Sequence, residues 1–159
     1  MTTSTDTTVR RTVVVDAPVD HAFTFFTRDI GQWWDADKHL LKEPLKEMVL
    51  EPFVGGHIID RGVDGGESRW ATILAYDPPG HVAFSWDINP EWQIETDRSK
   101  VSEVHVTFTD QGNGRTLVEL EHRHLDRHGP DWKSLRDAVG SPNGWSLEGY
   151  AAALHASGG

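Results

Sequence analysis

The stretch that decides the fold spans Arg69 to Trp86 and reads RWATILAYDPPGHVAFSW. Its centre, DPPG at residues 77–80, is typical of a tight turn, because proline fixes φ and lacks an amide donor while glycine tolerates positive φ. After the turn, Val82, Phe84 and Trp86 alternate with smaller or polar residues. This period of two predicts a half-buried antiparallel strand, so the whole stretch predicts a β-hairpin.

Similar alternation on both sides of the hairpin predicts further strands at residues 8–16, 46–51, 57–63, 101–109 and 115–124. Apolar residues at helical spacing follow Pro18 and lead to a second short helical turn at residues 30–34. The C-terminal segment is also predicted to be helical, with a first piece at residues 130–139 and a second beginning at Pro142. One face of that second piece carries Leu147, Tyr150, Ala151 and Leu154.

The composition is that of one globular domain. The chain has 159 residues, of which 37% are hydrophobic and 25% charged. We expect residues 1–7 to form a disordered tail and residues 8–157 to form a single domain. The net charge of −10 disfavours nucleic acid and anionic membrane surfaces as partners. The absence of cysteine excludes disulfides, thiol nucleophiles and cysteine-ligated metals.

The chain shows no targeting pattern. Its first residues lack a basic region followed by an apolar run, and no apolar stretch approaches the roughly 18–20 residues that span a bilayer. We therefore expect a cytoplasmic protein, either a monomer or a homodimer.

Several segments resemble, in order and spacing, those of the SRPBCC superfamily, and within it the branch named after the activator of the heat-shock protein 90 ATPase. They are VVVDAPVDHAF at residues 13–23, Trp33-Trp34 followed by His39, EPFVGG at 51–56, the hairpin above, the hairpin at 104–122, and Gly144-Trp145. The resemblance implies an α+β fold called helix-grip: a curved seven-stranded antiparallel sheet around a long C-terminal helix, with two short helices after the first strand.

A sheet that curls around a helix tends to leave a cavity where the two diverge. We expect eight residues to line it: Trp33, His39, Trp70, Phe84, Trp86, His122, His124 and Trp145. The tryptophans supply either a stacking surface for a flat apolar ligand or ordinary core. His39, in a charged loop, is either a gate to the cavity or a solvated histidine.

The last predicted strand places Leu120, His122 and His124 on one face, so both histidines should point inward. Each is then satisfied by a backbone carbonyl or water, contacts a ligand at the cavity mouth, or binds a metal with a third ligand from His128, His57 or a carboxylate. The family that the chain resembles is not typically metal-dependent, so we expect no metal and no cofactor. Ligand contact by a histidine would make binding depend on pH near neutrality.

No catalytic residue is assigned, because the sequence shows no nucleophile elbow, no phosphate-binding loop and no isolated pair of carboxylates. The leading hypothesis is a non-enzymatic protein that binds a small hydrophobic or aromatic molecule. One alternative is a module that contacts a chaperone ATPase, which a basic docking face would favour. The other is an enzyme of cyclase or hydrolase type acting in the cavity.

Overall fold

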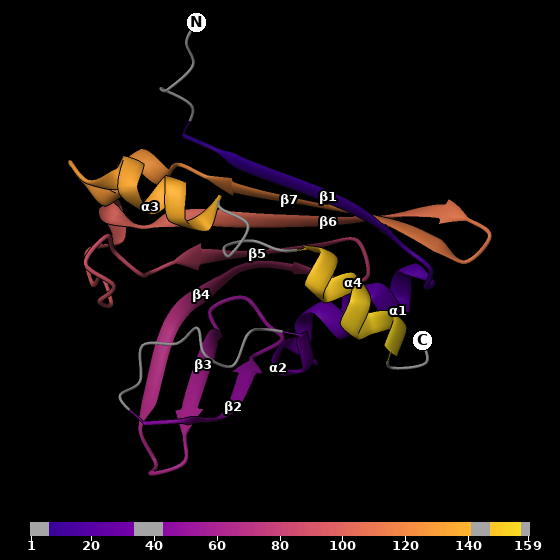
Figure 1. Cartoon of the computed structure of the whole chain (residues 1–159), viewed down its shortest axis with the longest axis horizontal. Coiled ribbons are helices and arrows are strands. Elements are labelled where there is room, and N and C mark those ends of the chain that lie inside the picture. The colour runs from indigo at the N-terminus through magenta and orange to yellow at the C-terminus, as the bar shows by residue number, and fades with distance from the viewer. Residues whose placement is uncertain (1–6, 34–42, 141–146, 157–159) are drawn as a thin grey trace, which may run out of the picture.

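A computed structural model describes residues 7–33, 43–140 and 147–156 of the chain (Figure 1). The first half contains β1 (Val9–Val15), α1 (Val19–Thr27), α2 (Ile30–Trp33), β2 (Leu45–Leu50), β3 (His57–Gly62) and β4 (Glu67–Asp77). The second half contains β5 (His81–Trp86), the 3₁₀ helix η1 (Arg98–Lys100), β6 (Ser102–Gly112), β7 (Arg115–Arg123), the 3₁₀ helix η2 (Leu125–His128), α3 (Trp132–Val139) and α4 (Leu147–Ala156). Residues 1–6, most of the predicted tail, lie outside the described part.

The seven strands form one antiparallel sheet, as the resemblance implies, and their order in the sheet is β1-β7-β6-β5-β4-β3-β2. The hairpin predicted around residues 77–80 is formed by β4 and β5, with Tyr76 opposite Val82 and Asp77 opposite His81. The pairing register shifts within β2–β3, β3–β4 and β4–β5. Such bulges bend a strand and increase its twist, which is how this half of the sheet curls away from β1, β6 and β7 in Figure 1.

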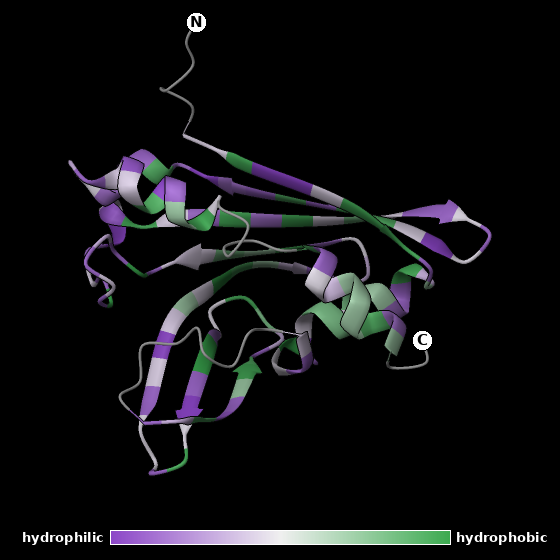
Figure 2. Cartoon of the chain, viewed as in Figure 1, coloured by the Kyte–Doolittle hydropathy of each residue, from purple (hydrophilic) through white to green (hydrophobic). Residues whose placement is uncertain are grey.

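The apolar positions of β5, β6 and β7 lie on the concave face and join the helices in one core. Along β7, Val118, Leu120 and His122 are buried. The helices α1, α2 and α4 gather together, and α4 packs against β1, α1 and α2. Figure 2 shows α4 as mainly hydrophobic, in keeping with the burial of the four residues predicted to share one face: Leu147, Tyr150, Ala151 and Leu154.

The C-terminal part of the chain is helical on both sides of residues 141–146, which lie outside the described residues. The described residues form two helices, α3 with eight residues and α4 with ten. Gly140 follows α3 and its amide donates to the carbonyl oxygen of Arg136. The end of α3 at Val139 agrees with the sequence, which predicts a first helical piece at residues 130–139 before Gly140, and glycine is a poor helix former. No helix among the described residues is long and apolar enough to cross a membrane.

Candidate functional site

Three aromatic side chains from the decisive hairpin meet on the concave face of the sheet. Trp70, on β4, lies edge-to-face with Trp86, on β5, at a ring-centroid distance of 5.4 Å. Trp70 also meets Phe84 at 6.1 Å and 86°. All three are buried. The three residues, all predicted to line the cavity, thus lie beside one another, and edge-to-face pairs of this kind stabilise a core beyond the area they bury.

The indole N–H of Trp70 is satisfied within the protein. It donates to Oδ1 of Asp60, on β3, at 3.0 Å, and both side chains are buried. Tryptophan is fully buried at low cost only when its N–H finds an acceptor. Asp60 thus fixes the orientation of Trp70, and Trp70 in turn sets the position of Trp86.

His122 extends the aromatic group across the sheet. Its ring centroid lies 5.1 Å from that of Trp86, and the residue is 0% exposed. The prediction that His122 points inward is confirmed. Val104, on β6, lies opposite His122, and Ser102, two residues earlier, lies opposite Trp86 on the neighbouring strand. The register therefore brings Ser102 to the same face as Trp86 and His122.

Ser102 joins two buried histidines. Its Oγ lies 2.7 Å from Nε2 of His122 and 2.7 Å from Nε2 of His128, which comes from η2. The three side chains are buried. We call Ser102, His122 and His128 the serine–histidine cluster. The hydroxyl of Ser102 has one proton, so at least one of the two Nε2 atoms must be the donor to Oγ.

Burial keeps both histidines of the cluster neutral. It lowers the pKa of His122 to about 3, with a smaller contribution from the nearby His128. It lowers the pKa of His128 to about 4, against an opposing effect of the Glu95 carboxylate. A charge in this environment loses its hydration without an adequate partner. The cluster is therefore a neutral hydrogen-bonding group near pH 7, and its titration lies below the range in which the sequence suggested pH-dependent binding.

The prediction that His124 also points inward is wrong. Strand β7 ends at Arg123, and His124 adopts a left-handed backbone with φ of 63° at the start of η2. Its side chain is exposed. Alternation holds only while the backbone stays extended, so the left-handed residue breaks the period by which it was assigned. The His-x-His spacing consequently does not put two imidazoles on one face.

The other predicted lining residues have different places. Trp33 is half-buried, meets Phe26 at 4.8 Å and Tyr150 at 5.4 Å, and donates its indole N–H to the carbonyl oxygen of Phe26. It belongs to an aromatic group between the helices. His39 and Trp145 lie outside the described residues. Among those that are described, no three histidine, aspartate or glutamate side chains are arranged to hold a metal ion.

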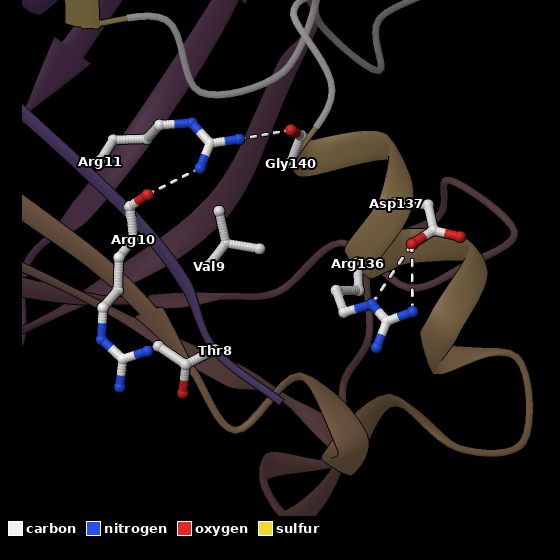
Figure 3. Close-up of a pocket in the computed structure, with 7 residues that line it drawn as sticks. All are labelled: Thr8, Val9, Arg10, Arg11, Arg136, Asp137 and Gly140. Atoms are coloured by element: carbon white, nitrogen blue, oxygen red, sulfur yellow. Dashed lines mark hydrogen bonds and ion pairs between the residues drawn. The ribbon is translucent and has the colours of Figure 1, made fainter. Parts of the chain in front are cut away.

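A pocket of about 420 Å³ lies elsewhere, between the start of β1 and the end of α3 (Figure 3). Arg11 crosses it and donates to the carbonyl oxygens of Arg10 and Gly140. Arg136 pairs with Asp137 at 3.2 Å. The lining is polar and charged, unlike the aromatic cavity that the sequence predicts, and its guanidinium groups already bind backbone or carboxylate oxygens. The remaining lining residues are Thr8 and Val9.

Sequence reasoning missed Ser102 and gave His128 only as a possible metal ligand. The signal for Ser102 was present, since continuing the Val104–Val106 alternation back by two residues puts it on the buried face. His128 had no such signal, because its position depends on the turn that η2 makes over the end of the sheet.

The chain was also compared with known proteins. A search of the curated proteins found no match. Among solved structures, an anthrahydroquino-γ-pyrone synthase, Txn09, is 37% identical over 96% of this chain and 99% of its own, with a TM-score of 0.67. A self-sacrificing resistance protein, CalC from Micromonospora echinospora, is 29% identical over 96% of each chain, with a TM-score of 0.71.

A solution structure from Arthrobacter aurescens shares the fold at 17% identity, covering 98% of this chain and 90% of its own, with a TM-score of 0.65. The family profile described as "Activator of Hsp90 ATPase homolog 1-like protein" matches residues 16–146. With the helix-grip sheet and its C-terminal helices, this match shows that the chain belongs to the family of activator of Hsp90 ATPase homolog 1-like proteins, within the SRPBCC superfamily.

Proposed function

We propose that this protein binds a planar, polycyclic aromatic small molecule against the concave face of its sheet. The observation that carries the proposal is the continuous array of rings formed by Trp70, Trp86 and His122, with centroid spacings of 5.4 and 5.1 Å. A flat ligand would pack against these rings by entering among side chains that are buried in the structure, and the neutral serine–histidine cluster would supply polar contacts beside it.

The comparisons support this class of ligand. The relative at 37% identity is named as a synthase of an anthrahydroquino-γ-pyrone, a fused-ring aromatic compound. That relative matches nearly the full length of both chains. The aromatic side chains of this chain are consistent with a ligand of the same chemical class. The residues that line each protein's own site determine which compound of that class it binds.

Fluorescence titration with 1-aminoanthracene tests the proposal. Binding should quench or shift the tryptophan emission, and Trp86→Leu should weaken the affinity at least about fivefold, since it removes one aromatic ring from the array. Trp92→Leu is the matched control, because Trp92 is 50% exposed on the loop after β5. Circular dichroism would verify that both variants fold. Equal affinity of the Trp86 and Trp92 variants would place the site elsewhere.

A second candidate is an enzyme that acts on such a molecule, for example by closing a ring. The specific observation in its favour is the serine–histidine cluster, a buried set of proton donors and acceptors next to Trp86. The hydrogen bonds that define the cluster join one serine to two histidines, whereas a nucleophilic serine is usually activated through a histidine that a carboxylate orients. A single-turnover assay would separate catalysis from binding, since only an enzyme changes the mass of the bound compound.

Contact with a chaperone ATPase is the alternative that the family's name implies. A basic docking face would favour such contact, whereas the net charge of the chain is −10. Two arginines near the outer face of the sheet are also paired, Arg10 with Glu121 at 3.4 Å and Arg127 with Glu103 at 3.2 Å. Because these charges neutralise one another, we rank this alternative below ligand binding.

A further inference from the structure

We propose that Nδ1 of His128 accepts a hydrogen bond from a hydroxyl group of the ligand, so that the protein selects hydroxylated aromatic molecules over molecules of the same shape without that donor. The juxtaposition behind this inference is a buried ring nitrogen with an open acceptor position in the cluster that adjoins Trp86. The inference rests on the proposed function and narrows its ligand class.

Nδ1 of His128 is a buried nitrogen without a hydrogen-bond partner among the described residues. The whole residue is only 6% exposed. Its other ring nitrogen, Nε2, is held by Ser102 at 2.7 Å. Buried polar atoms in native proteins nearly always have a partner, since desolvation without one costs about 1–3 kcal/mol. A ligand group that donates a hydrogen bond to this nitrogen would therefore remove an unfavourable desolvation.

The hydrogen bonds of Ser102 indicate whether Nδ1 of His128 donates or accepts. If Ser102 donated to Nε2 of His128, the proton of that neutral ring would sit on Nδ1 as a buried N–H without an acceptor. If His128 donates from Nε2 to Ser102, Ser102 can donate onward to Nε2 of His122, and Nδ1 of His128 keeps a bare lone pair. Among buried backbone groups, N–H groups without an acceptor are rarer than acceptors without a donor, and we apply the same preference to the ring. The second arrangement leaves an acceptor.

The imidazole of His128 is neutral near pH 7. The groups that act on His128 are Ser102 on β6, His122 on β7 and, through its field, Glu95 in the loop after β5. Burial outweighs the Glu95 carboxylate and holds the pKa of His128 at about 4, so the lone pair is available near pH 7. A nitrogen of this basicity accepts a hydrogen bond from a phenol but does not remove its proton. The role is recognition, with no covalent step.

The cluster that contains His128 adjoins the aromatic rings through His122. The His122 ring bonds Ser102 through Nε2 and lies 5.1 Å from the Trp86 ring, so the cluster and the ring array share one member. A fused-ring molecule packed against Trp86 would carry a peripheral hydroxyl toward the cluster. Molecules without a donor would leave Nδ1 of His128 unpaired and lose that contribution.

Paired titrations with 2-naphthol and 2-methoxynaphthalene test the inference, because the two probes share a ring system and only 2-naphthol has a donor. The wild-type protein should bind 2-naphthol about three- to tenfold more tightly, the range expected for one neutral hydrogen bond. His128→Leu should abolish that preference, while His124→Leu, at an exposed position on the same turn, should retain it.

The results of these titrations distinguish the inference about His128 from the proposed function. Equal affinity of the wild-type protein for both probes, or a preference that persists in His128→Leu, overturns the inference and leaves the proposed function intact. Failure of the wild-type protein to bind either probe overturns both.

A measurement on the wild-type protein avoids any dependence on how well His128→Leu folds. Long-range proton–nitrogen spectra of the protein labelled with ¹⁵N-histidine report which ring nitrogen carries the proton. His128 should be protonated at Nε2, and its Nδ1 signal should move toward lower frequency with 2-naphthol but remain in place with 2-methoxynaphthalene. A proton on Nδ1 of His128 in the free protein would exclude the acceptor role.

Discussion

The hydroxyl of Tyr150 donates a 2.6 Å hydrogen bond to the carbonyl oxygen of Ala22. Tyr150 lies on α4 and Ala22 on α1, so this bond joins the two ends of the chain. Both residues are 0% exposed, and burial raises the pKa of Tyr150, which keeps the group protonated as a donor. The bond fixes how α4 sits beside α1 and, through its rings, beside Phe26 and Trp33.

Replacing Tyr150 by phenylalanine should therefore lower the free energy of unfolding by about 0.5–1.5 kcal/mol, because one buried hydrogen bond is lost while the ring packing is kept. Urea denaturation would measure it. Tyr76→Phe is the matched control, since Tyr76 is half-buried and packs edge-to-face on Phe23 at 5.4 Å. A loss for Tyr150→Phe no larger than for Tyr76→Phe would contradict the stabilising role of the bond.

Leu154 should be a large contributor to the packing of α4. The residue is 0% exposed within the core, so Leu154→Ala should cost about 2–4 kcal/mol through lost burial and a residual cavity. Leu74→Ala removes the same atoms at a position that is 40% exposed and should cost less than about 1 kcal/mol. Urea or thermal unfolding of the two variants measures the difference. Equal losses in the free energy of unfolding for Leu154→Ala and Leu74→Ala would contradict the packing of α4 against the core.

The serine–histidine cluster should make stability depend on pH in the mildly acidic range. Unfolded histidines titrate near 6.5, whereas burial lowers the pKa of His122 to about 3 and that of His128 to about 4. The unfolded state then binds more protons below about pH 6.5, so the free energy of unfolding falls as the pH falls toward about 4 and is constant above about 6.5. Each histidine contributes up to about 1.4 kcal/mol per pH unit in that window.

Urea denaturation at about pH 7, 6 and 5 measures this dependence. His122→Asn should remove about half of the contribution of the two buried histidines, while His124→Asn, at an exposed site, should leave the dependence as in the wild-type protein. Carboxylates with lowered pKa values, such as that of Glu103 beside His105 and Arg127, lose their contribution mainly below about pH 4.5, under the lowest of these three pH values. An unchanged slope for His122→Asn would disprove the burial argument.

Arg11 should stabilise the junction between β1 and α3. Its guanidinium donates to the carbonyl oxygens of Arg10, at 2.7 Å, and of Gly140, which follows α3 (Figure 3). A cation at a helix C-terminus satisfies carbonyl groups that the helix leaves open. Arg11→Met should therefore cost about 1–2 kcal/mol and speed amide exchange in α3.

Arg115→Met is the control for Arg11, since Arg115 forms an exposed ion pair with Asp16 at 3.2 Å. Exposed pairs contribute about 0–1 kcal/mol. If both arginine variants lose the same stability and α3 exchanges at the wild-type rate in each, Arg11 acts only as a surface charge.

The sequence predicted the order of the elements because local rules decide them. The period of two in β5 and β7, the DPPG turn between β4 and β5, and the helical spacing of Leu147, Tyr150, Ala151 and Leu154 are all short-range patterns, and each has its counterpart in the structure. The same patterns brought Trp70, Phe84, Trp86 and His122 to the concave face.

The sequence alone therefore determined which side chains face inward, as long as the backbone stays regular. Only the tertiary structure decided which of them meet. Ser102, His122 and His128 come together because the β6–β7 register aligns two strands and η2 turns back over their end. His124 leaves the site because one left-handed residue ends the alternation. Register and turn geometry result from the packing of distant segments, and no local period encodes them.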